Sequence, residues 1–261
     1  IHASADIFGD GSYVVETGSG GENSADAQKT YIEAKIELTP TPDDNAVNKV
    51  GQQHTILATV SVTEDGSTWT PVSGASVTLA IASDSTGSAS LNPLSGTTNG
   101  SGQFSSQLVA SSPGVVRVSG SATITSYNGV VMAQPVTVST GTGAPNSDNA
   151  QKTYVKAKIT LTPLEAYNGI GDPHTVTATV LVDRGSGYTA ESGINVTFTL
   201  PTNNAGATFV GSSSATTNSS GQATATITAS SPGLVTIHAS ADIFGDGSYV
   251  VETGSGGENS A

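Results

Sequence analysis

Carboxylates are the side chains in this sequence whose spacing comes nearest to a binding site. The passage DIFGDGS occurs twice and places Asp6 and Asp10, and again Asp242 and Asp246, four positions apart ahead of a glycine. A calcium loop carries oxygen ligands at positions 1, 3 and 5 and a glycine at position 6. Position 3 is phenylalanine in both copies and position 12 is not acidic, so a Gly-Asp-Gly turn that closes a β-hairpin is the favoured interpretation over a calcium site.

A second group of carboxylates and amides precedes each of two related segments, AQKTYIEAKIELTP and AQKTYVKAKITLTP. Such oxygen atoms are the ligands that Ca²⁺ takes in proteins, and a metal placed between two modules would stiffen their junction. The alternative is that acidic residues only keep a short polar linker soluble. The candidate calcium ligands of this group are Glu22, Asp26 and Asp148, with Asn23, Asn146 and Asn149 beside them.

Other residue types that carry chemistry do not form recognisable patterns. The four histidines, His2, His54, His174 and His238, each lie at or in an expected strand with no second ligand at metal spacing. No serine lies in a nucleophile-elbow pattern, and the GSGG sequences at 18–21 and 254–257 are not followed by a helix that could bind phosphate. They have the composition of flexible linkers. We therefore expect no enzymatic activity, no catalytic residues and no cofactor apart from the calcium alternative.

The composition is typical of an exported β-protein and narrows the class of partner. The chain has 31 glycines, no cysteine, and 8 basic against 21 acidic residues, which gives a net charge of −13. This charge disfavours nucleic acid and anionic lipid as partners. The modules cannot rely on disulfides, and no apolar run reaches the roughly 20 residues of a membrane-spanning helix.

Two nested repeats organise the chain. Residues 1–25 recur letter for letter as residues 237–261, a shift of 236 residues, as expected for a window cut from a longer repeating polymer. Inside that repeat, AQKTY recurs at a shift of 123, and the later motifs recur at shifts of 119 to 120. We therefore expect 1–25 to be the last two strands and linker of a preceding repeat, 26–146 to be a first domain, and 147–261 to be a second domain with its linker.

Alternating β-branched residues between turn sequences predict short strands and no long helix. About seven such strands per domain predict tandem immunoglobulin-like sandwiches with Greek-key topology, an all-β fold. A seventh strand in the second domain is expected around Tyr188 or Phe209. The other expected strands are 32–38, 55–62, 75–81, 103–109, 115–124 and 130–138 in the first domain, and 155–161, 175–182, 194–200, 222–228, 234–242 and 249–252 in the second.

Four motifs recur in order in both domains: GxxHTxxATV (51–60 and 171–180), SGxxVT (73–78 and 192–197), TTNxSGQ and ASSPGxVxxxxSA. As a set they resemble the bacterial immunoglobulin-like domains of group 1, the tandem modules of invasin-type and intimin-type surface proteins. The resemblance implies a rigid, extracellular stalk at the cell surface, without catalysis by the stalk itself. The linkers before each QKTY depart from the pattern of that group.

The sequence thus predicts a structural segment of a long bacterial or archaeal surface protein, whose partners are neighbouring repeats of the same protein. One alternative is a filament subunit that exchanges strands, with the linker and QKTY segment as the natural donor. The other is an adhesin module that binds a carbohydrate or a host receptor through its loops. Paired aromatic residues are expected at contacts: Tyr31 and Tyr154 between modules, and Trp69 and Tyr188 on the sandwich rim or, alternatively, exposed for a ligand.

Overall fold

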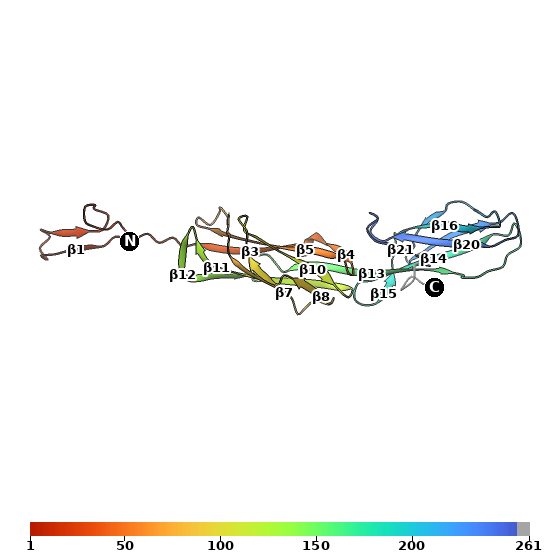
Figure 1. Ribbon diagram of the computed structural model, residues 1–261, viewed down its shortest axis with the longest axis horizontal. Helices are drawn as coiled ribbons and strands as arrows, with labels where there is room; N and C mark the ends of the chain where they lie inside the picture. Colours follow the sequence, from red (N-terminus) through yellow and green to blue (C-terminus); the bar gives the residue numbers. More distant parts are fainter. Residues whose placement is uncertain (255–261) are drawn as a thin grey trace.

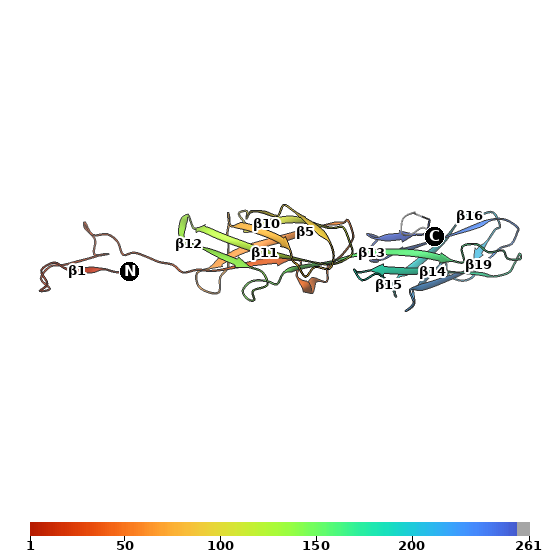
Figure 2. The same ribbon diagram turned by 90° about the horizontal axis from the view of Figure 1, so that it is seen from below.

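The computed structural model describes residues 1–254 and is an elongated row of β-structure (Figure 1). A small hairpin lies at the N-terminal end, and two β-sandwiches follow along the same long axis in both views (Figure 2). The last residues of the repeated passage, including most of the 254–257 glycine sequence, lie outside the described residues. No helix within residues 1–254 is long and apolar enough to cross a membrane.

The first sandwich, called module 1, consists of two antiparallel sheets. One sheet has the order β3-β5-β10-β8 with β6 on β5, and the facing sheet contains β7, β9, β11 and β12. This is the strand distribution of a constant-type immunoglobulin sandwich. The strands are β3 (Glu33–Thr39), β5 (Gln53–Thr63), β6 (Thr70–Pro71), β7 (Ser76–Ile81), β8 (Ala89–Asn92), β9 (Ser95–Thr97), β10 (Gln103–Ala110), β11 (Gly114–Tyr127) and β12 (Val130–Ser139).

The second sandwich, called module 2, repeats this plan. Its first sheet pairs β14 with β13, β15 and β19, and β19 with β17; its second sheet has the order β18-β16-β20-β21. Both positions expected for the seventh strand, Tyr188 and Phe209, lie in short strands. The strands are β14 (His174–Asp183), β15 (Tyr188–Ala190), β16 (Asn195–Asn203), β17 (Thr208–Phe209), β18 (Ser214–Thr216), β19 (Gln222–Thr228), β20 (Val235–Asp242) and β21 (Val250–Glu252).

One long strand, β13 (Ala150–Thr162), belongs to both modules. Its first part pairs with β11 of module 1 and its second part with β14 of module 2, so that a 10-stranded sheet runs through the junction. In Figure 2, β13 passes from the central body into the C-terminal one. The sequence division at residue 147 falls just before this strand, and the pairing of residues 150–154 lies within module 1.

Each module has its own core, made by the inward residues of its strands. In β3 and β5, every second side chain is buried, as at Ile36, Leu38, Ile56 and Val60. The first core ends with Ala150 and Tyr154, and the second begins with Val155. The all-β fold of tandem immunoglobulin-like sandwiches is therefore confirmed. The repeats at shifts of about 120 residues reflect this equivalence of two separately packed cores.

The N-terminal hairpin joins β1 (Ser4–Asp6) to β2 (Val14–Glu16) and copies the end of module 2. Its register, Ser4 with Glu16, is that of Ser240 with Glu252 in β20 and β21. Both hairpins close through the GDGS passage, so the turn predicted there is confirmed. The extended residues 28–31 connect this hairpin to module 1 (Figure 1).

Candidate functional site: the junction between the modules

The junction is built on the edge of β11, where residues 150–154 of β13 are paired. The register runs from Gly114 opposite Tyr154 to Val118 opposite Ala150, in antiparallel orientation. β12 occupies the same edge further along, opposite residues 121–127. The AQKTY segment thus completes an edge that β12 covers only in part.

The other side of the segment is covered by the loop that follows β3. Here β4 (Val47–Lys49) pairs with residues 153–155 in parallel orientation. The Thr153 amide donates to the Ala46 carbonyl at 2.9 Å, and the Gln151 amide donates to the Pro40 carbonyl at 3.1 Å. The segment is therefore held between two neighbours, as an interior strand would be.

Tyr154 anchors the segment in module 1. Its side chain is fully buried, and its hydroxyl donates to the Leu108 carbonyl at 3.2 Å. Burial raises the pKa of Tyr154 to about 12, because the phenolate would be poorly solvated there. The expectation that Tyr154 packs between modules is confirmed: it lies on a strand of module 2 and fills the core of module 1.

Lys152 is also enclosed at the junction, although it carries a charge. It is only 4% exposed, and this burial lowers the pKa of its ammonium group. The pKa of His54 is lowered as well, first by its own burial and then by the nearby charge of Lys152. Both shifts follow from the enclosure of these two side chains where β13 docks on module 1.

Gly114 and Gly185 allow the backbones of the two modules to approach closely, and Gly87 packs against Gly114 within module 1. A Cβ on Gly114 would lie 2.6 Å from the Gly87 nitrogen, and a Cβ on Gly185 of module 2 would lie 2.8 Å from the Gly114 Cα. Gly114 and Gly185 also have φ angles of +137° and +108°, which side chains rarely adopt. Glycine is therefore required here by both space and conformation.

Tyr249 adds a second contact across the junction. Its hydroxyl accepts a hydrogen bond from the Ala157 amide at 2.7 Å, and the Lys49 ammonium of module 1 lies 5.8 Å from the centre of its ring. Burial raises the pKa of Tyr249. The hairpin of module 2 is thus positioned against both its own β13 and the β4 loop of the preceding module.

The GSGG sequence at residues 18–21 lies in an ordered loop, which corrects the expectation of a flexible linker there, and residues 140–149 form a similar loop. In residues 140–149, the Gly141 amide donates to the Ser147 carbonyl at 2.8 Å, and the loop lies along β3, because Asn146 Oδ1 accepts from the Ile36 amide at 3.0 Å. In residues 17–26, Gly18 donates to Ser24 at the same distance. Composition alone cannot show these hydrogen bonds, which hold the glycines in a defined turn.

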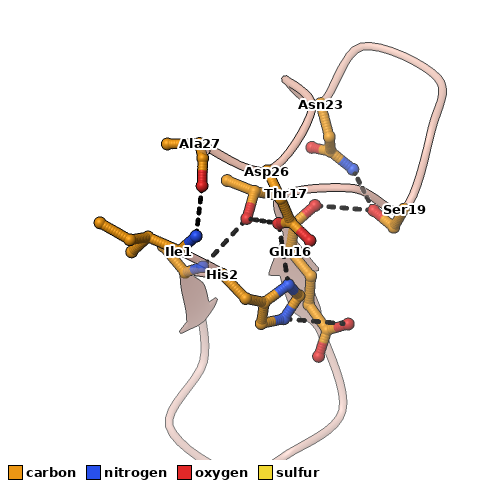
Figure 3. Close-up of polar contacts among 9 residues, drawn as sticks. Ile1, His2, Glu16, Thr17, Ser19, Asn23, Asp26 and Ala27 are labelled. Carbon is orange, nitrogen blue, oxygen red and sulfur yellow. Dashed lines mark hydrogen bonds and ion pairs between the residues drawn. The ribbon is translucent and has the colours of Figure 1, made fainter. Parts of the chain in front are cut away.

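Figure 3 shows the N-terminal copy of this loop closed by polar contacts. The Asp26 carboxylate accepts from the Thr17 hydroxyl and lies 3.0 Å from His2 Nδ1. The N-terminal amine of Ile1 donates to the Ala27 carbonyl, and the Ala27 amide donates to the Ile1 carbonyl at 3.1 Å. In the loop before β13, the Thr140 hydroxyl and Asn149 take the roles of Thr17 and Asp26.

The candidate calcium ligands of the DIFGDGS passages are engaged by their own turns. Asp6 accepts from the amides of Phe8, Gly9 and Gly11, and Asp242 accepts from those of Phe244 and Gly247. Asp10 and Asp246 accept from Ser12 and Ser248, whose hydrogen bonds lower the pKa of each carboxyl. These oxygens satisfy backbone donors, as expected for the turn.

The boundary carboxylates are spread out. Asp26 is bound within its loop, the backbone carbonyl of Asp148 accepts from the Ser147 hydroxyl, and Glu22 is exposed. Across residues 1–254, no three His, Asp or Glu side chains come together in a group that could hold a metal ion. Calcium binding at Glu22, Asp26 and Asp148 stays a prediction to be tested by chelation.

The rim aromatics follow one design in both modules. The Lys35 ammonium lies 4.7 Å from the centre of the Trp69 ring, and that of Lys158 lies 4.3 Å from the centre of the Tyr188 ring. Both aromatic side chains are half-buried. A lysine on the first strand of each sandwich therefore covers the ring, as expected for packing at the rim.

Two parts of the junction are absent from the strand pattern read from the sequence. The strand expected at 155–161 begins five residues earlier, and β4 was not expected at all. The repetition of AQKTY ahead of each first strand was the available signal for the early start. β4 has only three residues, without alternating apolar and polar side chains. Its pairing depends on a segment more than a hundred positions later, so no local signal indicates it.

No protein-family model and no curated protein sequence matches this chain. Solved structures do match, at 11–21% identity. The D0-D1 domain of intimin is 21% identical, with a TM-score of 0.28, over 83% of this chain and 93% of that one. The Escherichia coli adhesin FdeC is 15% identical, with a TM-score of 0.44, over 84% and 61%. Invasin, a bacterial integrin-binding protein, is 16% identical, with a TM-score of 0.25, over 85% and 38%. The chain is thus similar to immunoglobulin-like modules of intimin and invasin, the group that its sequence motifs resemble.

Proposed function

We propose that this chain is a structural segment of an extracellular surface protein, in which immunoglobulin-like modules extend a stalk and transmit tension along it. The observation that carries the proposal is β13, which is a strand of both modules. A force that separates the modules along this strand acts on its ladder to β11, and on the buried Tyr154, as well as on the covalent chain. A junction of this kind fixes the distance and direction between neighbours.

The chemistry of the chain agrees with a spacer. The residues that gather at the junction include glycines, a buried tyrosine, an enclosed lysine and paired backbone amides, which hold the two modules together. The net charge of −13 keeps a long exposed polymer soluble. In an array where each module contacts only its neighbours, length increases with the number of modules. The surface location is part of the same proposal, and antibody labelling of intact source cells tests it.

The stalk role is tested by the stiffness of the junction. Small-angle X-ray scattering of the 261-residue chain is compared with that of a variant carrying Gly-Gly-Ser-Gly inserted between Tyr154 and Val155. We expect a single long maximum dimension for the parent chain and a broad distribution of shorter ones for the variant. If the parent chain is as broadly distributed as the variant, the junction does not hold the modules in line and the proposal is wrong.

A further inference from the structure

Module 2 has an open groove at the place where module 1 holds residues 150–154. The groove has a volume of about 670 Å³ and lies at the far end of module 2, between β20 and the loop after β13. Leu164, Tyr167, Ile170 and Leu234 are exposed around it. By the repeat, Gly233–Ile237 corresponds to Gly114–Val118, the edge that the AQKTY segment covers in module 1.

Burial at corresponding positions shows what the groove lacks. Val116 and Val118 are fully buried beneath residues 150–154, whereas their counterparts Val235 and Ile237 are only half-buried. Gly114 is buried, whereas Gly233 is exposed. The two modules have the same motif there, so the difference follows the presence of the strand. Exposed apolar residues at an unpaired strand edge are typical of a surface that receives another strand.

The chain contains a second AQKTY sequence, residues 27–31, which is not paired with the edge of a sandwich. Residues 28–31 are extended, outside any strand, and Tyr31 is 82% exposed, although its counterpart Tyr154 is fully buried. Lys29 is the counterpart of the enclosed Lys152. The groove of module 2 is lined by Glu165 and Asp172, so its charge suits a lysine.

The N-terminal hairpin already shows the first step of this pairing. Ile1 is the copy of Ile237, and it exchanges two backbone hydrogen bonds with Ala27, the copy of Ala150 (Figure 3). In module 1, Val118 pairs with Ala150 at the same place. The residue types of the module 2 edge therefore accept the start of AQKTY in the register seen at the junction.

We propose that the groove of module 2 binds residues 27–31 of a second copy of this chain, from Ile237 opposite Ala27 to Gly233 opposite Tyr31. The segment exchanges its short pairing with Ile1 for a five-residue ladder, and Tyr31 fills the apolar groove. Asp26 then faces Thr253 and His238, which are copies of its present partners Thr17 and His2. This inference rests on the proposed function, because it extends the shared-strand junction to two chains.

Such a contact is head-to-tail. The donor segment runs between the N-terminal hairpin and module 1 (Figure 1), whereas the residues of the groove belong to the far end of module 2. Each bound copy therefore leaves one free groove and one free segment. Contacts of this type do not close on themselves unless the rotation allows a ring, and they build open chains. The interaction surface therefore predicts linear polymers of the whole chain rather than compact dimers.

The test uses cysteine pairs in the full chain, which has no cysteine of its own. Gln28→Cys with Thr236→Cys places one thiol on each partner at the position equivalent to Gln151 opposite Arg117. Cross-strand neighbours lie within the reach of a disulfide. We expect a ladder of disulfide-linked dimers, trimers and longer species on mild oxidation. Gln28→Cys with Val131→Cys is the matched control, because Val131 is exposed outside the groove.

Tyr31→Ala in the Gln28→Cys/Thr236→Cys background separates docking from random collision. Since Tyr31 is exposed, this change leaves the fold intact, and we expect at least about a tenfold loss of ladder yield, as for an aromatic anchor. Tyr31→Phe should restore most of it. A chain that stays monomeric, a ladder equally strong in the Val131 control, or a ladder unchanged by Tyr31→Ala would each overturn the proposal. Scattering from the unmodified chain, at a dilution where it is monomeric, reports the stiffness of its own junction independently, so the stalk proposal can stand when this one fails.

Discussion

The edge of β11 in module 1 and the edge of β20 in module 2 consist of related residues, but another strand covers only the first of them. In module 1, residues 150–154 cover the edge, and Val116, Val118 and Gly114 are buried; in module 2, the counterparts of all three are more exposed. The comparison teaches that a module of this chain is complete only when it receives the first residues of the following unit. Module boundaries in sequence and in packing therefore differ by several residues.

The largest expected effect comes from removing the anchor of the filled edge. Tyr154→Ala should lower the free energy of unfolding of module 1 by about 3–5 kcal/mol, because it empties a fully buried aromatic site. Trp69 is the only tryptophan and lies in module 1, so its fluorescence during urea unfolding follows that module. Tyr31→Ala, at the same repeat position, should change the free energy of unfolding of module 1 by less than about 0.5 kcal/mol. Equal effects of the two substitutions would contradict the difference between the docked Tyr154 and the exposed Tyr31.

Alkaline pH should weaken module 1 through the same tyrosine. The pKa of Tyr154 is raised from 10.0 to about 12, so its contribution is complete below pH 10 and is lost as pH rises through 12. A shift of this size corresponds to about 2–3 kcal/mol. Urea unfolding followed by Trp69 at pH 9 and pH 12 measures the loss. Tyr154→Phe should remove most of this pH dependence; an unchanged slope in that variant would show that another group causes it.

Val116 and Val235 are counterparts on the two edges, and their truncation compares the covered edge with the uncovered one. Val116→Ala should destabilise module 1 by about 2 kcal/mol, whereas Val235→Ala should destabilise module 2 by about 1 kcal/mol, because only Val116 is fully buried. Calorimetry of both variants measures the difference. The cost at Val235 should rise toward that at Val116 when a peptide with the sequence of residues 26–34 is added. A cost at Val235 already equal to that at Val116 without peptide would show that its edge is covered.

The close contact between Gly185 and Gly114 should contribute less to stability than the buried side chains. Gly185→Ala should cost about 1–2 kcal/mol, since it combines a φ of +108° with a Cβ that would lie 2.8 Å from the Gly114 Cα. Gly187→Ala is the control for backbone strain alone, because Gly187 has a φ of +97° and open space around it. The two variants are compared by calorimetry and by scattering. Identical maximum dimensions and stabilities would mean that Gly185 does not set the distance between modules.

Removal of calcium should have the smallest effect. The carboxylates of Asp6, Asp10, Asp242 and Asp246 already accept hydrogen bonds from their turns. A chelator should therefore change the melting temperature by less than about 1 °C, because carboxylates that already accept hydrogen bonds from their own turns gain little from an ion. A larger decrease that calcium restores and magnesium does not would establish calcium binding by this chain.

The sequence predicted much of the fold because its signals are local. Alternation at Ile36 and Leu38, turn residues in TTNxSGQ and ASSPG, and the repeats themselves predict two sandwiches and most of their strands. The junction could not be derived in the same way, because β4 depends on residues distant in sequence and Lys152 is buried only after β13 has docked. The GSGG sequence at residues 18–21 was predicted to be flexible from its glycines, although the Gly18 amide donates to the Ser24 carbonyl and Asn23 donates to Ser19.

The most direct test of the shared strand compares the two copies of AQKTY by amide hydrogen exchange. Residues 28–31 and 151–154 have the same sequence, QKTY, so their intrinsic exchange rates are nearly equal and each copy is the control for the other. At a dilution where the chain is monomeric, we expect the amides of Gln151 and Thr153 to be protected as strongly as the core of module 1, and those of Gln28 and Thr30 to exchange at once. Equally rapid exchange in both copies would contradict the account.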